Sequence, residues 1–217
     1  METSFSPMTD PVPPLVHRKR PLQARSAITV AAIGEAAIEV LLAEGIERTT
    51  TTRVAARAGV SVGSLYQYFP DKHSLLAAVL AQHLTHVAMA VERSCTEQRG
   101  GNVADMAQAL VNAYVGAKLE HARASQALYA IAAEHGGAER VEMARERMLA
   151  AVSGMLATAG DRDFSDPSRH AAILLGAIAG PVRNLLESNR HVMPGDDLKG
   201  ELVTLARAYL LAASTPC

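Results

Sequence analysis

Apolar residues recur at helical spacing along most of the chain, and this pattern predicts an all-α protein. In the first predicted helix, Ile33, Ala37 and Val40 share one face, and Gly45 is expected to end the helix. The later segments repeat the pattern between glycine, proline and capping residues. About nine helices result, over residues 26–43, 50–58, 61–68, 72–97, 103–119, 122–135, 138–159, 166–188 and 196–212.

The stretch TTTTRVAARAGVSVGSLYQYFPDK, residues 49–72, has the spacing of a helix-turn-helix. Ala55 is a small residue where two helices would cross, and Gly59 suits a turn with positive φ. Leu65 would pin the second helix on the first. Side chains that can cap the two helices precede them, namely Thr50 or Thr51 for the first and Ser61 for the second. The pattern therefore predicts two short helices that meet at a tight turn.

The second of these helices begins with small polar side chains, which suits a helix end that enters a major groove of roughly 12 Å. Val60 and Leu65 are expected to face inward. The residues predicted to read base edges are Ser61, Val62, Gly63, Ser64 and Gln67.

Composition and charge alone say little about function, and they become informative only together with this motif. The chain has 217 residues and a net charge of −1, with 49% hydrophobic and 4% aromatic residues. This composition favours close helix packing over a sandwich of aromatic-rich strands. Residues 17–72 carry more basic than acidic residues, and four of the basic ones precede the first helix. Residues 1–21 are predicted to be a disordered basic tail that either follows DNA or stays solvated.

The middle helices could enclose a ligand, because their apolar faces include several methionines and two tyrosines, Tyr114 and Tyr129. Ordinary core packing is the alternative for each of these residues, and none is predicted as a ligand contact.

The last two predicted helices, about 166–188 and 196–212, are expected to form a homodimer interface. Gly176 and Gly180 lie one turn apart, so another helix could approach closely, and Pro181 is expected to kink the first of these helices. The residues Leu198, Leu202, Leu205 and Tyr209 form an apolar seam on the second. The alternative is that both helices complete the core of a monomer.

Other chemistry is weakly represented. His83 and His86 share a helix face but lack a third ligand nearby in sequence, and Cys95 is expected to be an idle thiol. The sequence contains no nucleotide-binding or hydrolase motif, so no catalytic residue, cofactor or metal is predicted. No signal peptide or membrane span is predicted either, and the expected location is cytoplasmic.

The segment AARAGVSVGSLYQYFPDKHSLL closely resembles the DNA-binding signature of TetR-type transcriptional regulators (TetR/AcrR type). The resemblance extends back through PLQARSAITVAAIGEAAIEVLLAEG and covers roughly residues 21–80. It implies a three-helix DNA-binding domain over residues 22–72 and an effector-binding and dimerisation domain over residues 73–217.

The resemblance also implies contacts with the DNA backbone from Lys72 and from Tyr66 or Tyr68. Packing inside the small domain is the alternative for one of the tyrosines. Together with the predicted caps and tail, the expected DNA-binding set is Arg25, Thr50, Thr51, Ser61, Val62, Gly63, Ser64, Tyr66, Gln67, Tyr68 and Lys72.

The function predicted from these features is a one-component regulator, a repressor that binds a palindromic operator as a dimer and is released by a small-molecule effector. An activator would have the same residues. The rival from another class is an all-helical small-molecule-binding or catalytic protein whose helix-turn-helix does not bind DNA.

Overall fold

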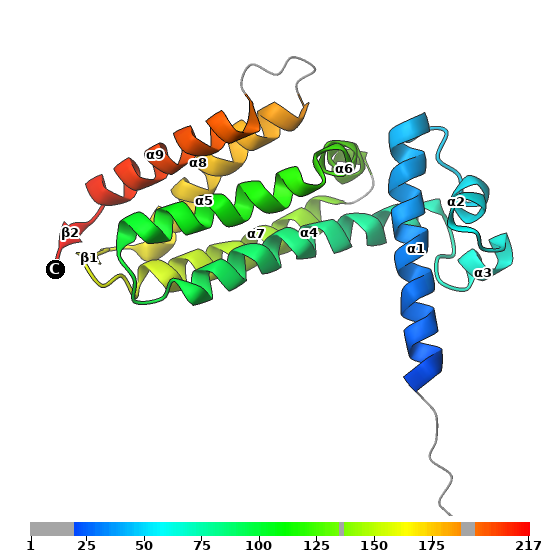
Figure 1. Ribbon diagram of the computed structural model, residues 1–217, viewed down its shortest axis with the longest axis horizontal. Helices are drawn as coiled ribbons and strands as arrows, with labels where there is room; N and C mark the ends of the chain where they lie inside the picture. The colour runs from blue at the N-terminus through cyan, green and yellow to red at the C-terminus, as the bar shows by residue number, and fades with distance from the viewer. Residues whose placement is uncertain (1–19, 135–136, 188–193) are drawn as a thin grey trace, which may run out of the picture.

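The computed structural model describes residues 20–134, 137–187 and 194–217, and within these ranges nearly all of the chain is helical (Figure 1). The prediction of an all-α fold is confirmed. The described ranges contain the helices α1 (Arg20–Glu44), α2 (Thr51–Ala58), α3 (Val62–Tyr66), α4 (Lys72–Glu97), α5 (Val103–Glu120), α6 (Ala122–Glu134), α7 (Gly137–Leu156), α8 (Pro167–Glu187) and α9 (Gly195–Ala212), and the strands β1 (Arg162–Asp163) and β2 (Thr215–Pro216).

Polar side chains cap several helices in the way that the sequence predicts. Thr50 caps α2 by accepting a hydrogen bond from the Arg53 amide, and Ser61 caps α3 by accepting one from the Ser64 amide. Asp71 caps α4 in the same way through the Ser74 amide. Each cap pairs an amide that the helix itself leaves without a partner, so these side chains fix where the helices begin.

The N-terminal core joins α1, α2 and α3 to the beginning of α4. Ile33 and Ala37 of α1 are fully buried, as are Val54 of α2 and Leu65 of α3. Leu128 and Ile131 of α6 also belong to this core. One helix of the C-terminal part is therefore packed into the N-terminal unit.

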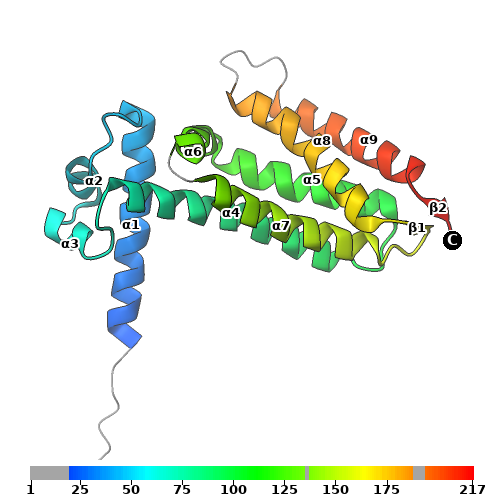
Figure 2. The same cartoon turned by 180° about the vertical axis from the view of Figure 1, so that it is seen from behind.

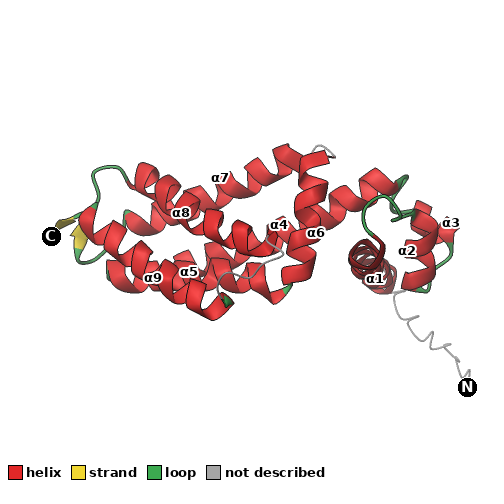
Figure 3. Ribbon diagram, turned by 90° about the horizontal axis from the view of Figure 1, so that it is seen from above, coloured by secondary structure: helices red, strands yellow, loops and turns green. Residues whose placement is uncertain are grey.

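The C-terminal part is a helical bundle in which α4, α5, α7, α8 and α9 run side by side, with α6 across the end nearest to α1 (Figures 1 and 2). Its core takes apolar side chains from each of those five helices. Figure 3 shows α3 at one end of the molecule and the C-terminus at the other. The helix α4 is the rod that connects the two parts.

Several boundaries differ from the predicted ones. Helix α1 begins at Arg20, where a disordered tail was predicted, and the rest of that tail lies outside the described residues. Helix α3 ends at Tyr66, two residues early, because the chain must turn for Phe69 to reach the core. The ribbon of β1 and β2 was not predicted. It pairs residues more than 50 positions apart, which local patterns cannot reveal.

Two helices meet the length and composition of a membrane span, but this is weak evidence of one, because buried core helices meet the same test. They are Ser26–Glu44 within α1 and Lys72–Glu97, the whole of α4. Both supply buried residues to the protein's own cores, including Ile33 from α1 and Leu76 and Val91 from α4. This packing is typical of the core helices of a folded domain.

Candidate nucleic-acid interface and ligand pocket

The turn between α2 and α3 is held by one glycine and one buried leucine. Gly59 has φ +69° and ψ +27°, a left-handed conformation in which a Cβ is strained, and its amide donates to carbonyls at the end of α2. Leu65 is fully buried against α1 and α2. The predicted helix-turn-helix is therefore present, with α3 fixed on the outer side of α2.

The outer side of α3 is open to solvent. Ser61, Gly63 and Gln67 are exposed, whereas Val62 and Ser64 are half-buried. A Cβ added at Gly63 would meet only the Ser61 hydroxyl oxygen, at 3.8 Å. In Figures 1 and 2, α3 lies on the side of α2 that faces away from the helical bundle. The predicted reading residues thus share one accessible tip, although Val62 also packs on the N-terminal core.

The two candidate tyrosines have different surroundings. Tyr66 is 49% exposed, and its hydroxyl lies 3.1 Å from the Thr51 hydroxyl at the start of α2. Tyr68 is half-buried against the core, and its hydroxyl accepts a hydrogen bond from Ser26 of α1 at 3.3 Å. Tyr66 and Thr51 therefore form an outward polar edge, while Tyr68 holds α1 to the segment after α3.

Three basic side chains near this tip already have partners within the protein. The Lys72 ammonium donates to the Ile46 carbonyl at 2.5 Å, which ties the start of α4 to the loop before α2. Arg53 pairs with Glu44, and Arg57 pairs with Glu39. Arg25 belongs to α1, but its side chain lies outside the described residues. A contact from Lys72 to DNA would thus require it to share or exchange its Ile46 partner.

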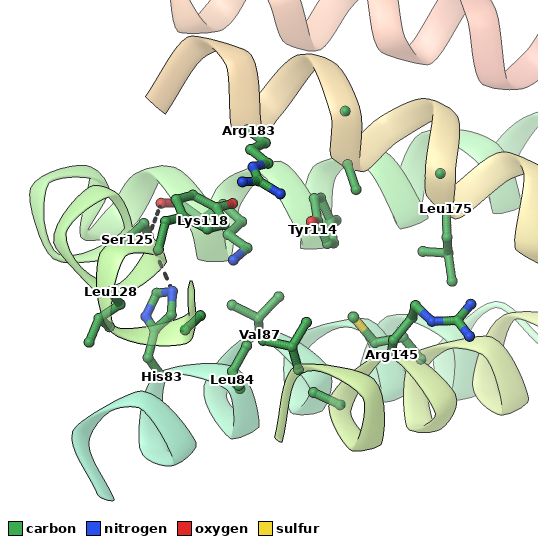
Figure 4. A pocket seen from close by; sticks show the side chains of 18 of the residues that line it. His83, Leu84, Val87, Tyr114, Lys118, Ser125, Leu128, Arg145, Leu175 and Arg183 are labelled. Carbon is green, nitrogen blue, oxygen red and sulfur yellow. Dashed lines mark hydrogen bonds between the residues drawn. The ribbon is translucent and has the colours of Figure 1, made fainter. Parts of the chain in front are cut away.

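A cavity of about 500 Å³ lies inside the C-terminal part, between α4, α5, α6, α7 and α8 (Figure 4). Its walls are mostly apolar. Polar groups enter it from every one of these helices, namely His83 from α4, Tyr114 and Lys118 from α5, Ser125 and Tyr129 from α6, Arg145 from α7 and Arg183 from α8. A mostly apolar cavity of this size with a few placed polar groups is typical of a small-molecule site.

The cavity residues include some whose role the sequence left open and one that it missed. The sequence left two alternatives for Tyr114, Tyr129 and Met148, a cavity wall or ordinary core, and the structure shows both: they line the cavity and also belong to the C-terminal core or pack against it. Lys118 was not singled out at all. A signal existed, because Lys118 follows Tyr114 by one helical turn and so falls on the apolar face of its helix.

Ser125 links two other polar residues of the cavity, His83 and Lys118. The Ser125 hydroxyl donates to the Lys118 carbonyl at 2.8 Å and lies 3.2 Å from His83 Nε2. Since that hydroxyl has one proton, His83 Nε2 must be the donor to it. Burial, together with the charge on Lys118, lowers the pKa of His83 to about 4, so this imidazole is neutral near pH 7.

The Lys118 ammonium lies 5.0 Å from the centre of the Tyr129 ring, and burial lowers its pKa to about 8. The Arg183 guanidinium lies 5.3 Å from the centre of the same ring and pairs with Glu187. Burial also raises the pKa of the Tyr114 hydroxyl. The cavity therefore carries positive charge at one end.

The other candidate sites carry no chemistry of this kind. Cys95 is buried, and this burial raises the pKa of its thiol to about 12, so the reactive thiolate is scarce near neutral pH. Within the described ranges, no group of three or more His, Cys, Asp or Glu residues could hold a metal ion. His83 instead lines the cavity, and His86 lies 3.2 Å from Glu120.

Comparison with known families assigns both parts of the chain. The family model for bacterial regulatory proteins of the tetR family matches residues 33–79, which hold the helix-turn-helix. A second model, the tetracyclin repressor-like C-terminal domain, matches residues 103–210, which hold most of the bundle. This chain belongs to the tetR family. As a TetR-family protein it is a transcriptional regulator, and the resemblance seen in the sequence is confirmed.

Curated relatives of this TetR-family regulator match over short segments of the chain. The transcriptional regulator YvdT of Bacillus subtilis is 35% identical over 52 residues, which cover 24% of this chain and 27% of that protein. The nucleoid occlusion factor SlmA of Pasteurella multocida is 38% identical over 50 residues, covering 23% of this chain and 25% of SlmA. The matched region thus spans about a quarter of each relative.

Solved structures match over nearly the whole fold. A TetR-family protein from Mesorhizobium loti has a TM-score of 0.74 at 22% identity, covering 88% of this chain and 99% of its own. SmeT, the repressor of the multidrug efflux pump SmeDEF of Stenotrophomonas maltophilia, has a TM-score of 0.66 at 23% identity, covering 87% and 93%. At these identities the likeness concerns the fold alone.

Proposed function

We propose that this TetR-family regulator is a cytoplasmic repressor that binds a palindromic operator as a homodimer and is released by a small-molecule effector. The proposal rests on two residues that belong both to the N-terminal core and to the lining of the cavity. Leu80 of α4 and Leu128 of α6 belong to the core that holds the helix-turn-helix, and both also line the cavity. A ligand in the cavity would therefore touch side chains that position the DNA-binding unit.

In this proposal, residues 22–72 bind DNA and residues 73–217 bind the effector and the partner subunit. The tip of α3 reads bases through Ser61, Gly63 and Gln67, which are exposed, with Val62 and Ser64 at its edge. Thr50, Thr51, Tyr66 and Lys72 contact the phosphates, and Arg25 extends this contact surface from α1. In a symmetric dimer, the two α3 helices then bind half-sites whose centres lie about 34–36 Å apart, or a multiple of that distance.

Release follows if the effector binds the DNA-incompetent arrangement more tightly than the competent one. Leu80, His83, Leu84 and Val87 form the α4 wall of the cavity, and α4 begins at Lys72, which is bonded to the loop before α2. A shift of α4 would therefore move the helix-turn-helix. In a dimer, such a movement would change the distance between the two α3 helices.

Dimerisation is proposed through α8 and α9, which leave apolar side chains on the surface. Ile173 of α8 and Leu205 and Leu211 of α9 are large, apolar and exposed. Gly176 and Gly180 also have open space where a Cβ would be, but both line the cavity, so the proposed interface rests on the exposed apolar side chains. Such a surface is typical of a protein contact site.

The proposal can be tested by identifying the operator and then by a substitution in α3 that prevents DNA binding. Genomic fragments retained by the purified protein would be sequenced, and their affinity would be measured for the wild type, Gly63→Glu and Gly116→Glu. Gly63→Glu places a carboxylate at the groove without a steric clash, and we expect roughly a 100-fold loss of affinity. Gly116 is exposed on α5 and equally open, so Gly116→Glu is the matched control.

The rival function is a small-molecule-binding or catalytic protein whose helix-turn-helix does not bind DNA. It would be favoured if no duplex were retained at low salt, or if Gly63→Glu bound the selected fragments as tightly as Gly116→Glu. An activator would bind the operator equally well but raise transcription, which a reporter assay distinguishes from repression.

A further inference from the structure

The charged residues that line the cavity are all basic. Lys118, Arg145 and Arg183 reach it from three different helices, and among the described residues no aspartate or glutamate lines it. His83 also lines it but is neutral near pH 7. An apolar cavity with basic but no acidic lining residues disfavours a cationic ligand and favours an anionic one.

Two of the three basic residues are already neutralised by carboxylates. Arg145 forms two hydrogen bonds with Glu142, and Arg183 Nε donates to Glu187 at 2.8 Å. Both arginines are also half-exposed, so water screens them. Neither arginine therefore requires a ligand to balance its charge.

Lys118 is different because it is buried and has no such partner. Its residue exposure is only 6%, and within the described part of the chain it forms no ion pair with a carboxylate. Among the described residues, no fully buried side-chain nitrogen or oxygen lacks a partner, so the Lys118 ammonium is not sealed in the core but opens onto the cavity. The Tyr129 ring, 5.0 Å away, offers only its face. Figure 4 shows Lys118 pointing from α5 into the space between α4 and α8. An ammonium that is largely desolvated and faces an apolar cavity without an anionic partner is stabilised when an anion enters that cavity.

We propose that the cavity binds an apolar carboxylate whose anionic end pairs with the Lys118 ammonium and whose apolar body lies along α4 and α7. The Lys118 end also holds donors suited to such a group, because the Tyr114 hydroxyl faces the same space. Away from that end, the lining side chains include Val87, Met148 and Leu149. This inference rests on the proposed function only for the claim that the ligand is an effector.

The test compares ligands that differ only at the polar end. Decanoate, decanol and decylamine, and the aromatic pair 2-naphthoate and 2-naphthol, would be titrated into the full-length protein by calorimetry at pH 7. We expect at least one carboxylate to bind about ten times more tightly than its alcohol, which corresponds to about 1.4 kcal/mol, and decylamine to bind no better than decanol.

Substitution of Lys118 tests whether this residue causes the preference for a carboxylate over an alcohol. In Lys118→Met the carboxylate and the alcohol should bind within about threefold of one another, whereas Lys199→Met, which removes a lysine from α9, should keep the wild-type preference. Circular dichroism checks that each variant is folded, and the wild-type ligand series decides the question even if Lys118→Met is not. The proposal is overturned if no carboxylate binds, if the alcohol or the amine binds as tightly as the carboxylate, or if a folded Lys118→Met retains the preference.

Operator release is a separate readout. Carboxylate binding that leaves operator affinity unchanged would contradict the effector part of the proposed function while the ligand class stands. Operator binding without any carboxylate binding would contradict the ligand class alone.

Discussion

At the scale of single residues, a few positions carry requirements that no other residue type meets. Gly59 holds a left-handed turn, Leu65 fills the space under α3, and Lys118 places a charge in an apolar cavity. The first two stabilise the fold. The third opposes folding, because the ammonium gives up water without gaining an anionic partner. Residues that cost stability in this way are frequent at functional sites.

Replacement of Gly59 by alanine should destabilise the helix-turn-helix. A Cβ at φ +69° costs about 1–2 kcal/mol, so the free energy of unfolding in urea should fall by about that amount. Gly63→Ala is the matched control, since Gly63 is helical, lacks a positive φ and has open space for a Cβ. Equal changes for the two variants would contradict the strain argument.

Lys118→Met should stabilise the protein in the absence of ligand. The folded-state pKa of Lys118 is lowered from 10.5 to about 8, so below about pH 8 both states are protonated and the folded state bears the whole cost of the buried charge. As the pH rises from about 8 to 10.5, the folded state loses this proton first and the cost disappears. We expect a gain on the order of 1–3 kcal/mol near pH 7 that becomes smaller towards pH 10.5.

Urea unfolding of Lys118→Met and the wild type at equal protein concentration would measure this difference across the pH range. Several other groups near Lys118 must be considered in the same range, namely His83, Tyr114, Tyr129 and Arg183. His83 is already neutral throughout it, and burial raises the pKa of both tyrosines. A difference that stayed constant from pH 7 to pH 10 would show that packing, and not charge, separates the two proteins.

At the scale of elements, short helices are positioned by caps and longer ones by their apolar faces. Helix α3 has only five residues, too few to be stable alone, so it depends on the Ser61 cap and on Leu65. Arg53 and Arg57 of α2 pair with glutamates of α1 and add to the alignment of these helices. These contacts hold α2 and α3 on α1, and the outer edge of this unit carries Thr51 and Tyr66.

Removal of the hydroxyl should have different effects at Tyr66 and at Tyr68. Tyr66→Phe removes an exposed hydroxyl proposed to contact a phosphate, so operator affinity should fall about three- to tenfold while thermal stability is unchanged. Tyr68→Phe removes the hydrogen bond from Ser26, so stability should fall by about 0.5–1 kcal/mol with operator affinity unchanged. The opposite assignment would make Tyr68 the phosphate contact.

At the scale of the whole molecule, α4 joins a DNA-binding unit to a ligand cavity and α8 and α9 close the far side of the bundle. The N-terminal core includes two residues of α6, so the two parts share side chains. In the proposed mechanism, a conformational change in the bundle would reach the DNA-binding unit through these packed side chains. In the proposed dimer, this local change alters the distance between the α3 helices of the two subunits.

Charge on the outer faces of α8 and α9 should break the dimer. Ile173→Glu and Leu205→Glu each place a carboxylate on an apolar surface that is 49% and 42% exposed in one chain, so neither should unfold the protomer. Light scattering after size-exclusion chromatography should give the mass of one chain for these variants. Met143→Glu is the control, because Met143 is 59% exposed on α7 and should leave a dimer intact. A dimeric Ile173→Glu, Leu205→Glu double variant would exclude this interface.

The sequence by itself determined the helices, their caps and the DNA-binding unit, because these depend on contacts between residues close along the chain. Thr50 and Ser61 cap the helices for which they were predicted as caps, and Gly59 takes the positive φ that its turn required. Only the tertiary structure decided the cavity and its charge. Lys118, Tyr129 and Arg183 come from three helices that pack together only after folding, and sequence spacing contains no information about which apolar face encloses empty space. The same reason explains why Tyr66 and Tyr68 could not be distinguished from sequence, since the Ser26 partner of Tyr68 is 42 residues away.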